Sequence, residues 1–245
     1  MRNIAMAICF DGTAYHGWQR QDNALSVQQI IEETAGRTAG ARTAVAGCGR
    51  TDAGVHALRY VCNFHAETKI PIDKIPLAFN SILPRDIRCM EAWEAKENFH
   101  AQYSAKGKQY RYVIDNRRIG DVFLRDRAWN YRYAELDIEA MQCACKPFVG
   151  VHDFAAFCAS GSQAASTVRQ IYSLSIQKRD GLLIMDVHGN GFLYNMVRII
   201  AGTLVYVGCG KIDAGDMPEI IESKVRKRAG ITAPPQGLYL KDVFY

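Results

Sequence analysis

Short segments in which apolar residues fill alternate positions, or every position, predict strands in the first half of the chain. In residues 4–10, apolar side chains occupy both odd and even positions, which is typical of a strand buried on both faces. The same reasoning predicts strands at residues 43–46, 60–65 and 87–93. The segments 43–46 and 60–65 flank a glycine-rich stretch, residues 47–56, which is therefore expected to link two elements of one sheet.

Apolar residues also recur with the period of a helix in several segments. Ser26 and Gln29 form a capping box at the start of the first helix, and Gly36 is expected to end it. The other expected helices are residues 75–83, closed by Pro84, residues 137–145, residues 192–207, and a last one that Asp216 and Glu219 cap and that runs to about residue 228.

The second half of the chain continues the mixture of strands and helices. Strands are expected at residues 109–114, 167–177, 182–188 and 237–244, and residues 179–181 are expected to close a hairpin between two of them. In both halves, strands therefore accompany amphipathic helices. The expected fold class is α/β (α+β), with two similar subdomains that comprise residues 1–105 and 106–245.

One charged residue stands out within residues 192–207, because this segment is apolar almost all round and carries only Arg198 as a charge. A helix with that pattern is expected to be buried. A guanidinium on a buried helix usually meets a carboxylate or a phosphate, so Arg198 predicts an anionic partner. The alternative is an arginine that reaches solvent from the edge of the helix.

The composition is that of an ordinary globular protein, with 245 residues, 49% hydrophobic and 22% charged. The formal net charge of +5 is compatible with an anionic partner. Basic residues gather in residues 37–42, 106–118 and 224–228. These clusters fit either a phosphate-binding surface or a solvated basic face, and charge alone does not decide between them.

Eight cysteines occur without any C-x-x-C pair, and the N-terminus shows no long apolar core of a signal peptide. A reducing cytoplasm is therefore expected. Cys143 and Cys145 form the closest pair, but on a helix this spacing points the two thiols to different sides, so no metal site is expected. No apolar run reaches the roughly twenty residues of a membrane span without a glycine or a charge.

The glycine-rich stretch places Gly47, Gly49 and Gly54 around one carboxylate, Asp52, and one guanidinium, Arg50. It is no P-loop, because Val55-His56 stands where Lys-Ser/Thr is required, and it lacks the third glycine of a dinucleotide fingerprint. Asp52 remains as a nucleophile or general base that a nearby arginine keeps ionised. The alternative is an Asp that only caps a turn, and the residue chemistry leaves both possibilities open.

Aromatic and basic residues cluster in two loops and on one strand. Residues 15–21 include Trp18, which could stack on a base or pack over its own domain. Residues 99–106 contain Phe99, His100 and Tyr103. In the strand 109–114, Tyr110 shares a face with other apolar residues, and a row of tyrosines is often only a sheet face.

Several of these stretches together resemble one family. Residues 49–57, Gly-Arg-Thr-Asp-Ala-Gly-Val-His-Ala, look like the signature of the tRNA pseudouridine synthase A family. Further matches follow in the family's order along nearly the whole chain: Phe10-Asp11-Gly12-Thr13 with Tyr15-His16-Gly17-Trp18-Gln19, Phe99-His100-Ala101, Lys108-Gln109-Tyr110-Arg111-Tyr112, Gly191 to Arg198, and Gly237-Leu238-Tyr239-Leu240. One departure is Ala156, where the family usually has serine, which puts a local polar contact in doubt.

The resemblance implies a pseudouridine synthase fold, in which two similar mixed subdomains with largely antiparallel sheets meet at a central active-site cleft. It implies a cytoplasmic isomerase that converts uridines 38–40 of the tRNA anticodon stem-loop to pseudouridine without a metal or an organic cofactor. It also implies a homodimer with tRNA lying across both subunits. The glycines around Asp52 would then leave room for a flipped nucleotide.

The resemblance also gives roles to individual residues. Asp52 is expected to be the nucleophile, either attacking C1′ or assisting removal of a proton from the sugar, and Arg198 is expected to lie opposite it. Arg50 is expected to help hold the flipped nucleotide, and Tyr110 to stack on the target base. The remaining expected tRNA-binding residues are Phe99, His100 and Tyr103.

Two rival functions use the same residues. A non-catalytic RNA-binding or RNA-chaperone module would use the basic and aromatic surface, but it would gain nothing from a carboxylate facing RNA phosphates. A small-molecule enzyme with Asp52 as its base would turn over free uridine or a nucleotide.

Overall fold

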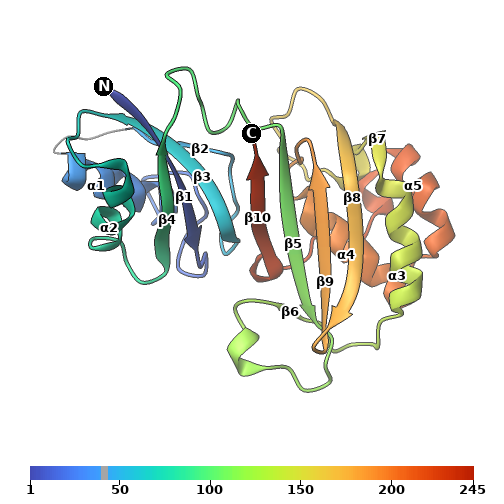
Figure 1. Cartoon of the computed structure of the whole chain (residues 1–245). Helices are drawn as coiled ribbons and strands as arrows, with labels where there is room; N and C mark the ends of the chain where they lie inside the picture. The colour runs from blue at the N-terminus through green and yellow to red at the C-terminus, as the bar shows by residue number, and fades with distance from the viewer. Residues whose placement is uncertain (40–43) are drawn as a thin grey trace. The chain divides into compact units, whose positions relative to one another are not determined.

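The computed structural model describes residues 1–39 and 44–245, and these form two compact units (Figure 1). The first unit comprises Met1–Lys106 together with Tyr239–Tyr245, and the second comprises Gly107–Leu238. The expected division after residue 105 assigned residues 239–245 to the second subdomain, whereas here they belong to the first. Within each unit, strands are mixed with helices and pair largely antiparallel, which confirms the expected fold class.

The first unit is built on a sheet whose strands run in the order β4, β1, β3, β10. Their bounds are Arg2–Phe10 for β1, His56–Ala66 for β3, Ile87–Glu94 for β4 and Leu238–Phe244 for β10, and a short β2, Ala46–Gly47, pairs with β3. β1 is antiparallel to both of its neighbours, and β10 is parallel to β3. Ile4 to Ile8 are fully buried, so β1 is covered on both faces, as its apolar pattern predicted.

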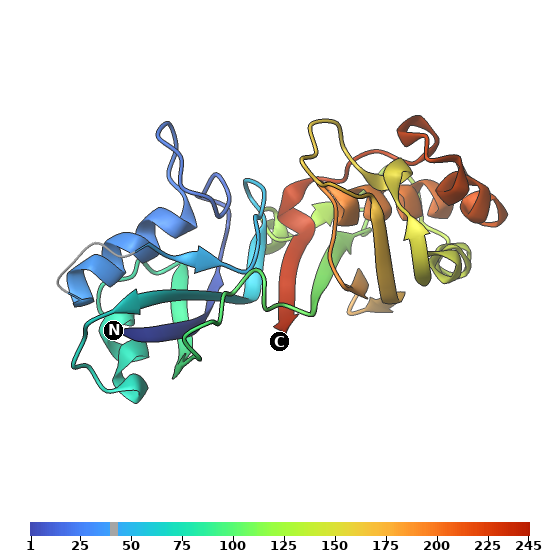
Figure 2. The same ribbon diagram turned by 90° about the horizontal axis from the view of Figure 1, so that it is seen from above.

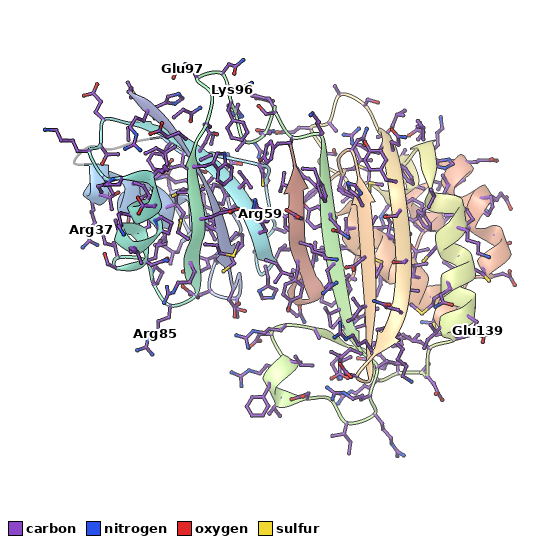
Figure 3. All side chains as sticks on the ribbon, viewed as in Figure 1. Arg37, Arg59, Arg85, Lys96, Glu97 and Glu139 are labelled. Carbon is purple, nitrogen blue, oxygen red and sulfur yellow. The ribbon has the colours of Figure 1, made fainter. Side chains whose placement is uncertain are left out.

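Side-chain contacts attach the distant C-terminal strand to the first unit. Arg59, labelled in Figure 3, lies on β3 and donates from Nε to Asp242 on β10 at 3.1 Å. Its Nη1 pairs with Glu91 on β4. The backbone amide of Lys106 also donates to the Phe244 carbonyl at 2.8 Å. The bonds to Asp242 and Phe244 join segments more than a hundred residues apart, which explains why periodicity within each segment could not predict the pairing.

Two α-helices of the first unit differ at their ends from the expectations. α1 spans Val27–Ala39 and continues through Gly36, so the expected end at that glycine is wrong. The Thr38 hydroxyl donates to the Thr34 carbonyl at 3.0 Å and satisfies a carbonyl of the last turn. Half of the expected capping box is present: the Gln29 amide donates to the Ser26 hydroxyl at 3.3 Å. The Gln29 side chain instead binds Glu33 at 2.9 Å.

The second helix, α2, spans Ile75–Asn80 after the short turn η1, Ile72–Lys74, and ends earlier than expected. The Asn80 side chain bonds to both the backbone N–H and the carbonyl of Cys89 on β4, at 2.9 and 2.8 Å. This pairing ties the end of the helix to the sheet. For the strand expected at residues 43–46, residue 43 lies outside the described residues, and the observed β2 covers only Ala46–Gly47.

The second unit is built on strands in the order β5, β9, β8, β7. Their bounds are Gly107–Asp115 for β5, Gly150–Asp153 for β7, Val168–Arg179 for β8 and Leu182–Gly189 for β9, and a short β6, Trp129–Asn130, runs parallel to β5. Asp180 and Gly181 both have positive φ, 51° and 78°, at the tip of the β8–β9 hairpin. Such a turn suits the twist of the paired strands, and the expected hairpin is confirmed.

The helices of the second unit gather on one side of its sheet (Figure 2). The α-helices are α3, Ile138–Cys145, α4, Met196–Gly208, and α5, Met217–Ser223. The unit also contains the single turns η2 Val122–Leu124, η3 Lys146–Phe148, η4 Ala155–Phe157, η5 Ala214–Asp216, η6 Arg226–Arg228 and η7 Pro235–Gly237. α3 packs against both α4 and β8. α4 is buried at nearly every position, as its sequence predicted.

Local backbone geometry corrects two expected helix boundaries in this unit. α4 begins at Met196 rather than residue 192, because Asn195 adopts a left-handed conformation with φ 59°. α5 ends at Ser223 rather than near residue 228, because Lys224 has φ 57°. The expected cap is also wrong, since the Asp216 side chain makes no cap hydrogen bond and Glu219 pairs with Arg228 at 2.9 Å.

Candidate active site

The stretch containing Asp52 connects β2 to β3. Residues of β3 form hydrogen bonds with the first residues of this stretch. The Cys48 amide donates to the Val61 carbonyl at 2.9 Å. The Tyr60 hydroxyl donates to the Gly49 carbonyl, and the Gly49 amide lies 3.4 Å from the same hydroxyl oxygen. Tyr60 is fully buried, so its ring is a fixed support for this part of the loop.

A second loop, residues 11–18, packs along the rest of the stretch. The Trp18 amide donates to the Thr51 carbonyl at 3.2 Å, and the Gly54 amide donates to the Tyr15 carbonyl at the same distance. The Asp52 carbonyl accepts a 3.2 Å bond from the Val55 amide, which closes a turn at the carboxylate-bearing residue. The backbone on both sides of Asp52 is therefore fixed by hydrogen bonds.

Two glycines of the second loop make this close packing possible. A Cβ on Gly12 would lie 2.0 Å from the Val55 carbonyl oxygen, and a Cβ on Gly17 would lie 2.1 Å from the Thr51 carbonyl oxygen. Gly17 also has φ 81°, which side chains other than glycine adopt only with strain. The motif Phe10 to Trp18 therefore supports the Asp52 loop through its backbone.

The structure decides between the two interpretations of Trp18. Its side chain is only 4% exposed, and its ring stacks on Tyr60 with centroids 4.1 Å apart. A Cβ on Gly47 would collide with both rings, at 2.2 Å from the Tyr60 hydroxyl and 2.4 Å from the indole. Trp18 therefore packs within its own unit, and the space beside Gly47 serves this packing and not a flipped nucleotide.

Tyr15 is similarly part of the support. Its hydroxyl donates to Asp86 Oδ1 at 2.8 Å, and its carbonyl accepts the Gly54 amide. Burial, together with the bond to Asp86, raises the pKa of the Tyr15 phenol, so it remains a neutral donor.

His56 connects the two loops, a role that sequence reasoning missed. It is 2% exposed, and its ring stacks on Tyr239 of β10 with centroids 4.7 Å apart. Its Nδ1 lies 3.0 Å from the Gly12 amide nitrogen, which donates to it. The Asp11 Oδ1 lies 3.2 Å from the same nitrogen. No local pattern could have indicated these contacts, because the partners lie more than forty residues away in the sequence.

Asp52 itself is half-buried, while Arg50 and Ala53 on either side of it are exposed. The carboxylate therefore stands on a fixed backbone next to residues that face solvent. This arrangement can present a carboxylate to a large substrate without requiring the loop to reorganise.

The second unit contains the other two predicted catalytic residues. Tyr110 on β5 is half-buried and packs edge-on against Phe192, with centroids 5.2 Å apart. Tyr112, two residues along the same face, is buried and donates to the Pro234 carbonyl at 2.7 Å. Burial raises the pKa of the Tyr112 phenol, and the charge of Arg198 opposes that rise.

Arg198 is half-buried on α4, and its guanidinium is fixed by neutral oxygens of its own unit. Nε donates to the Ala233 carbonyl at 2.7 Å, and Nη1 donates to Asn195 Oδ1 at 2.8 Å. Asp52 belongs to the first unit, and Arg198 and Tyr110 belong to the second. The pairing of Asp52 with Arg198 therefore stays a prediction.

The predicted tRNA-binding residues of the loop after β4 have different environments. Buried Asn3 and Asn63 bond to each other at 2.9 Å and hold the Phe99 carbonyl at 3.1 and 3.2 Å. The Phe99 ring packs against Tyr245, whereas Tyr103 is 80% exposed and stacks on His100. Lys96 and Glu97, labelled in Figure 3, lie at the start of this loop. Tyr103 is thus the most accessible ring of the three.

Many residues of the basic clusters bind carboxylates within their own unit. These pairs are Arg111–Asp186, Arg117–Asp115, Lys224–Asp153 and Arg228–Glu219, with N–O distances between 2.7 and 2.9 Å. The Arg226 guanidinium donates hydrogen bonds to the Gly230 carbonyl and the Thr232 hydroxyl. The cluster at residues 37–42 lies partly outside the described residues. A phosphate-binding surface must therefore rely on fewer cations than the sequence offers.

The described residues include no group of His, Cys, Asp or Glu that could hold a metal ion. No helix within residues 1–39 and 44–245 is long and apolar enough to span a membrane. No disulfide joins the eight cysteines, all of which are described. Cys143 is exposed and Cys145 is buried, where burial raises the thiol pKa to about 12.

Ala156, the departure from the expected motif, is fully buried in η4.

Comparison with known proteins decides the family. The model of a family described as tRNA pseudouridine synthase matches residues 6–104 and 144–245. The chain belongs to the tRNA pseudouridine synthase family. It is 48% identical over 245 residues to tRNA pseudouridine synthase A of Thermoanaerobacter sp. (strain X514), and 49% identical to the protein of that name from Acetivibrio thermocellus. Both alignments cover all of this chain and all of the relative.

Membership in the tRNA pseudouridine synthase family confirms the expected resemblance. Among solved structures, a chain of an archaeal box H/ACA sRNP Nop10–Cbf5 complex aligns with 92% of this synthase-family chain and 59% of its own length. The identity is 11% and the TM-score is 0.37, a likeness too distant to indicate function.

Proposed function

We propose that this chain isomerises uridine to pseudouridine in tRNA, at positions 38–40 of the anticodon stem-loop, with Asp52 as the nucleophile. Family membership supports the reaction class. The observation that carries the role of Asp52 is the fixed loop around it. Backbone bonds from Trp18, Gly54 and Val55 hold the residues on both sides of a carboxylate that is itself only half-buried.

Isomerisation breaks the bond between N1 and C1′ and forms a bond between C5 and C1′. C5 loses its proton and N1 gains one, so the product has the same atoms as the substrate. The Asp52 carboxylate either attacks C1′, with the uracil leaving as an anion, or accepts a proton from the sugar as the uracil leaves. In both routes the base must first leave the helical stack, which costs a few kcal/mol.

The second unit would receive the flipped base. Tyr110 would stack on it, a contact worth about 1–3 kcal/mol in comparable sites. Arg198, whose guanidinium is already oriented by Ala233 and Asn195, would face Asp52 across the proposed central cleft. Exposed Arg50 would hold the flipped nucleotide, and Phe99, His100 and Tyr103 would contact the tRNA. Because Phe99 is packed against Tyr245, we assign the direct ring contact to Tyr103.

The proposal includes a cytoplasmic homodimer with tRNA across both subunits and with neither a metal nor an organic cofactor. A reducing compartment suits the eight cysteines, because none of their thiols is in a disulfide. Exposed apolar side chains at Ile119, Val122 and Phe123 support self-association.

Replacing the carboxylate tests the function. With a tRNA transcript that carries tritium at uridine C5, each isomerisation releases one tritium to water. We expect Asp52→Asn to lower this release by about a thousandfold or more, because the amide is no nucleophile or base at neutral pH. The affinity for tRNA should stay near that of the wild type. Asp22→Asn, which changes an exposed carboxylate, is the control and should retain full activity.

The same assay separates the rival functions. Retained tritium release by Asp52→Asn would refute the role of Asp52. An RNA-binding module would bind tRNA without releasing tritium even as wild type. A small-molecule enzyme would act on free uridine or a nucleotide, and we expect no turnover of either.

A further inference from the structure

Thr51, the residue before Asp52, has an unusual hydroxyl. Its Oγ1 is the buried side-chain oxygen or nitrogen that lacks a hydrogen-bond partner among the described residues. The carbonyl of the same residue is bonded to the Trp18 amide. The backbone of Thr51 is thus satisfied and fixed, while its side-chain hydroxyl is not.

An unpaired buried hydroxyl destabilises a folded protein, because the group has lost its bonds to water without gaining others. Valine has nearly the same shape as threonine but lacks the hydroxyl, so it would fill the position without that cost. The surrounding loop is otherwise well bonded at Gly49, Asp52 and Gly54. A general looseness of the loop therefore does not account for the unpaired group.

The position of the hydroxyl suggests what it binds. Thr51 as a whole is only partly buried, and rotation about its χ1 exchanges the positions of the hydroxyl and the methyl group. Its neighbour Asp52 must reach C1′ of the target nucleotide in the proposed function. The ribose group bonded to the adjacent carbon, and able both to donate and to accept a hydrogen bond, is the 2′-hydroxyl.

We propose that the Thr51 hydroxyl binds the ribose 2′-hydroxyl of the target nucleotide and makes this bond only when tRNA is present. The inference rests on the proposed function and adds a residue that distinguishes RNA from DNA at the reacting nucleotide. The hydroxyl is left unpaired in the tRNA-free protein because its partner belongs to the substrate.

A double-mutant cycle between protein and substrate tests the bond. The variants are Thr51→Val, which removes the hydroxyl, and Thr51→Ser, which keeps it. The substrates are two tRNA molecules with uridine or 2′-deoxyuridine at the modified position, and pseudouridine formation is followed under single-turnover conditions. On the ribose substrate we expect Thr51→Val to be slower by about tenfold, as for one lost hydrogen bond, and Thr51→Ser to stay near wild type.

The rates of each variant on the ribose and deoxyribose substrates, taken together, decide whether the proposal holds. If Thr51 binds the 2′-hydroxyl, Thr51→Val should lose no further rate on the deoxy substrate, because the bond is already absent. Additive losses, or full activity of Thr51→Val on the ribose substrate, would overturn it. The urea midpoint of Thr51→Val should equal or exceed that of the wild type. A lower midpoint, or a failure to fold, would show that the hydroxyl stabilises the protein and would also overturn the proposal.

The proposed function can fail separately. If the wild-type protein forms no pseudouridine in the ribose substrate, the reaction assignment is wrong. If the wild type is active and the cycle is additive, only the role of Thr51 is wrong.

Discussion

Gly17 has no reactive side chain, yet the backbone position of the Asp52 loop depends on it, because a Cβ there would collide with the Thr51 carbonyl. The chemical residues of the loop, Asp52 and Arg50, could be picked out from the sequence because their types and spacing are local features. The support could not be predicted in the same way. The contacts of Gly12, Gly17 and His56 join segments separated by more than thirty residues, and only the folded chain brings them together.

Comparison of Gly17→Ala with Gly210→Ala should separate backbone strain from crowding. Both glycines have positive φ, 81° and 72°, but only Gly17 has backbone atoms where its Cβ would lie, whereas Gly210 has open space. We expect Gly210→Ala to cost about 1 kcal/mol of unfolding free energy and Gly17→Ala about 2–4 kcal/mol. Urea unfolding measures both.

Activity gives a second readout of the same pair. Gly17→Ala displaces the Thr51 carbonyl next to Asp52, so its folded fraction should release tritium more slowly than that of Gly210→Ala. Equal rates for the two folded variants would contradict the idea that this contact positions Asp52.

At the scale of elements, the long strands were predicted well, whereas the short strands β2, β6 and β7 and the helix ends were predicted poorly. The long strands are marked in the sequence by alternating or continuous apolar residues, a signal that is local to each segment. Helix ends instead depend on single residues with left-handed backbone, such as Asn195 and Lys224, and on distant contacts such as that of Asn80 with Cys89. Propensity and capping rules do not contain those contacts. The segment that follows β5 likewise depends on one buried side chain, that of Asp115.

Asp115, at the end of β5, holds the start of that connection. Its carboxylate is 2% exposed and accepts bonds from Arg117 Nε and Nη2 at 2.7 and 2.9 Å and from the Asp121 amide at 3.1 Å. These bonds, led by those from Arg117, lower the pKa of Asp115. A carboxyl group with a lowered native pKa stabilises the fold above its unfolded pKa of about 3.9 and loses this effect as the pH falls through the native value.

We therefore expect Asp115→Asn to lower the unfolding free energy at pH 7 by about 1–3 kcal/mol, since it removes the charged acceptor of several hydrogen bonds. The difference from wild type should shrink below about pH 4. Urea unfolding at several pH values between 7 and 3 measures it. Asp126→Asn, which breaks an exposed pair with Arg125, is the control and should change stability little at any pH. A pH-independent difference for Asp115→Asn would exclude the electrostatic explanation.

At the scale of the whole molecule, the C-terminal residues Tyr239–Tyr245 belong to the same compact unit as the N-terminal part of the chain. The division into two mixed units follows the rhythm of strands and helices along the sequence. The membership of residues 239–245 does not, because it depends on Arg59, Asp242 and the pairing of β10 with β3. The family resemblance, carried by short motifs in order, was confirmed over most of the chain.

The segment between β5 and β6 bears on the proposed homodimer. Ile119, Val122 and Phe123 are 86%, 71% and 81% exposed, and they are carried by a connection that Asp115 anchors. Two arginines of the segment are paired with carboxylates of the same segment, Arg117 with Asp121 and Arg125 with Asp126. Their positive charge is therefore less available to bind phosphates. Apolar side chains held exposed on an anchored segment are typical of a protein interface.

We expect light scattering after size-exclusion chromatography to give a mass near twice the 27.4 kDa of the chain. The double variant Ile119→Asp, Phe123→Asp should shift this to the single-chain mass at micromolar concentration, because an aspartate in each apolar contact would be buried without a partner. Leu77→Asp, at an exposed leucine of α2 in the first unit, is the matched control and should stay dimeric. A wild-type monomer would refute the homodimer. A double variant that stays dimeric but loses tRNA affinity would assign this surface to RNA instead.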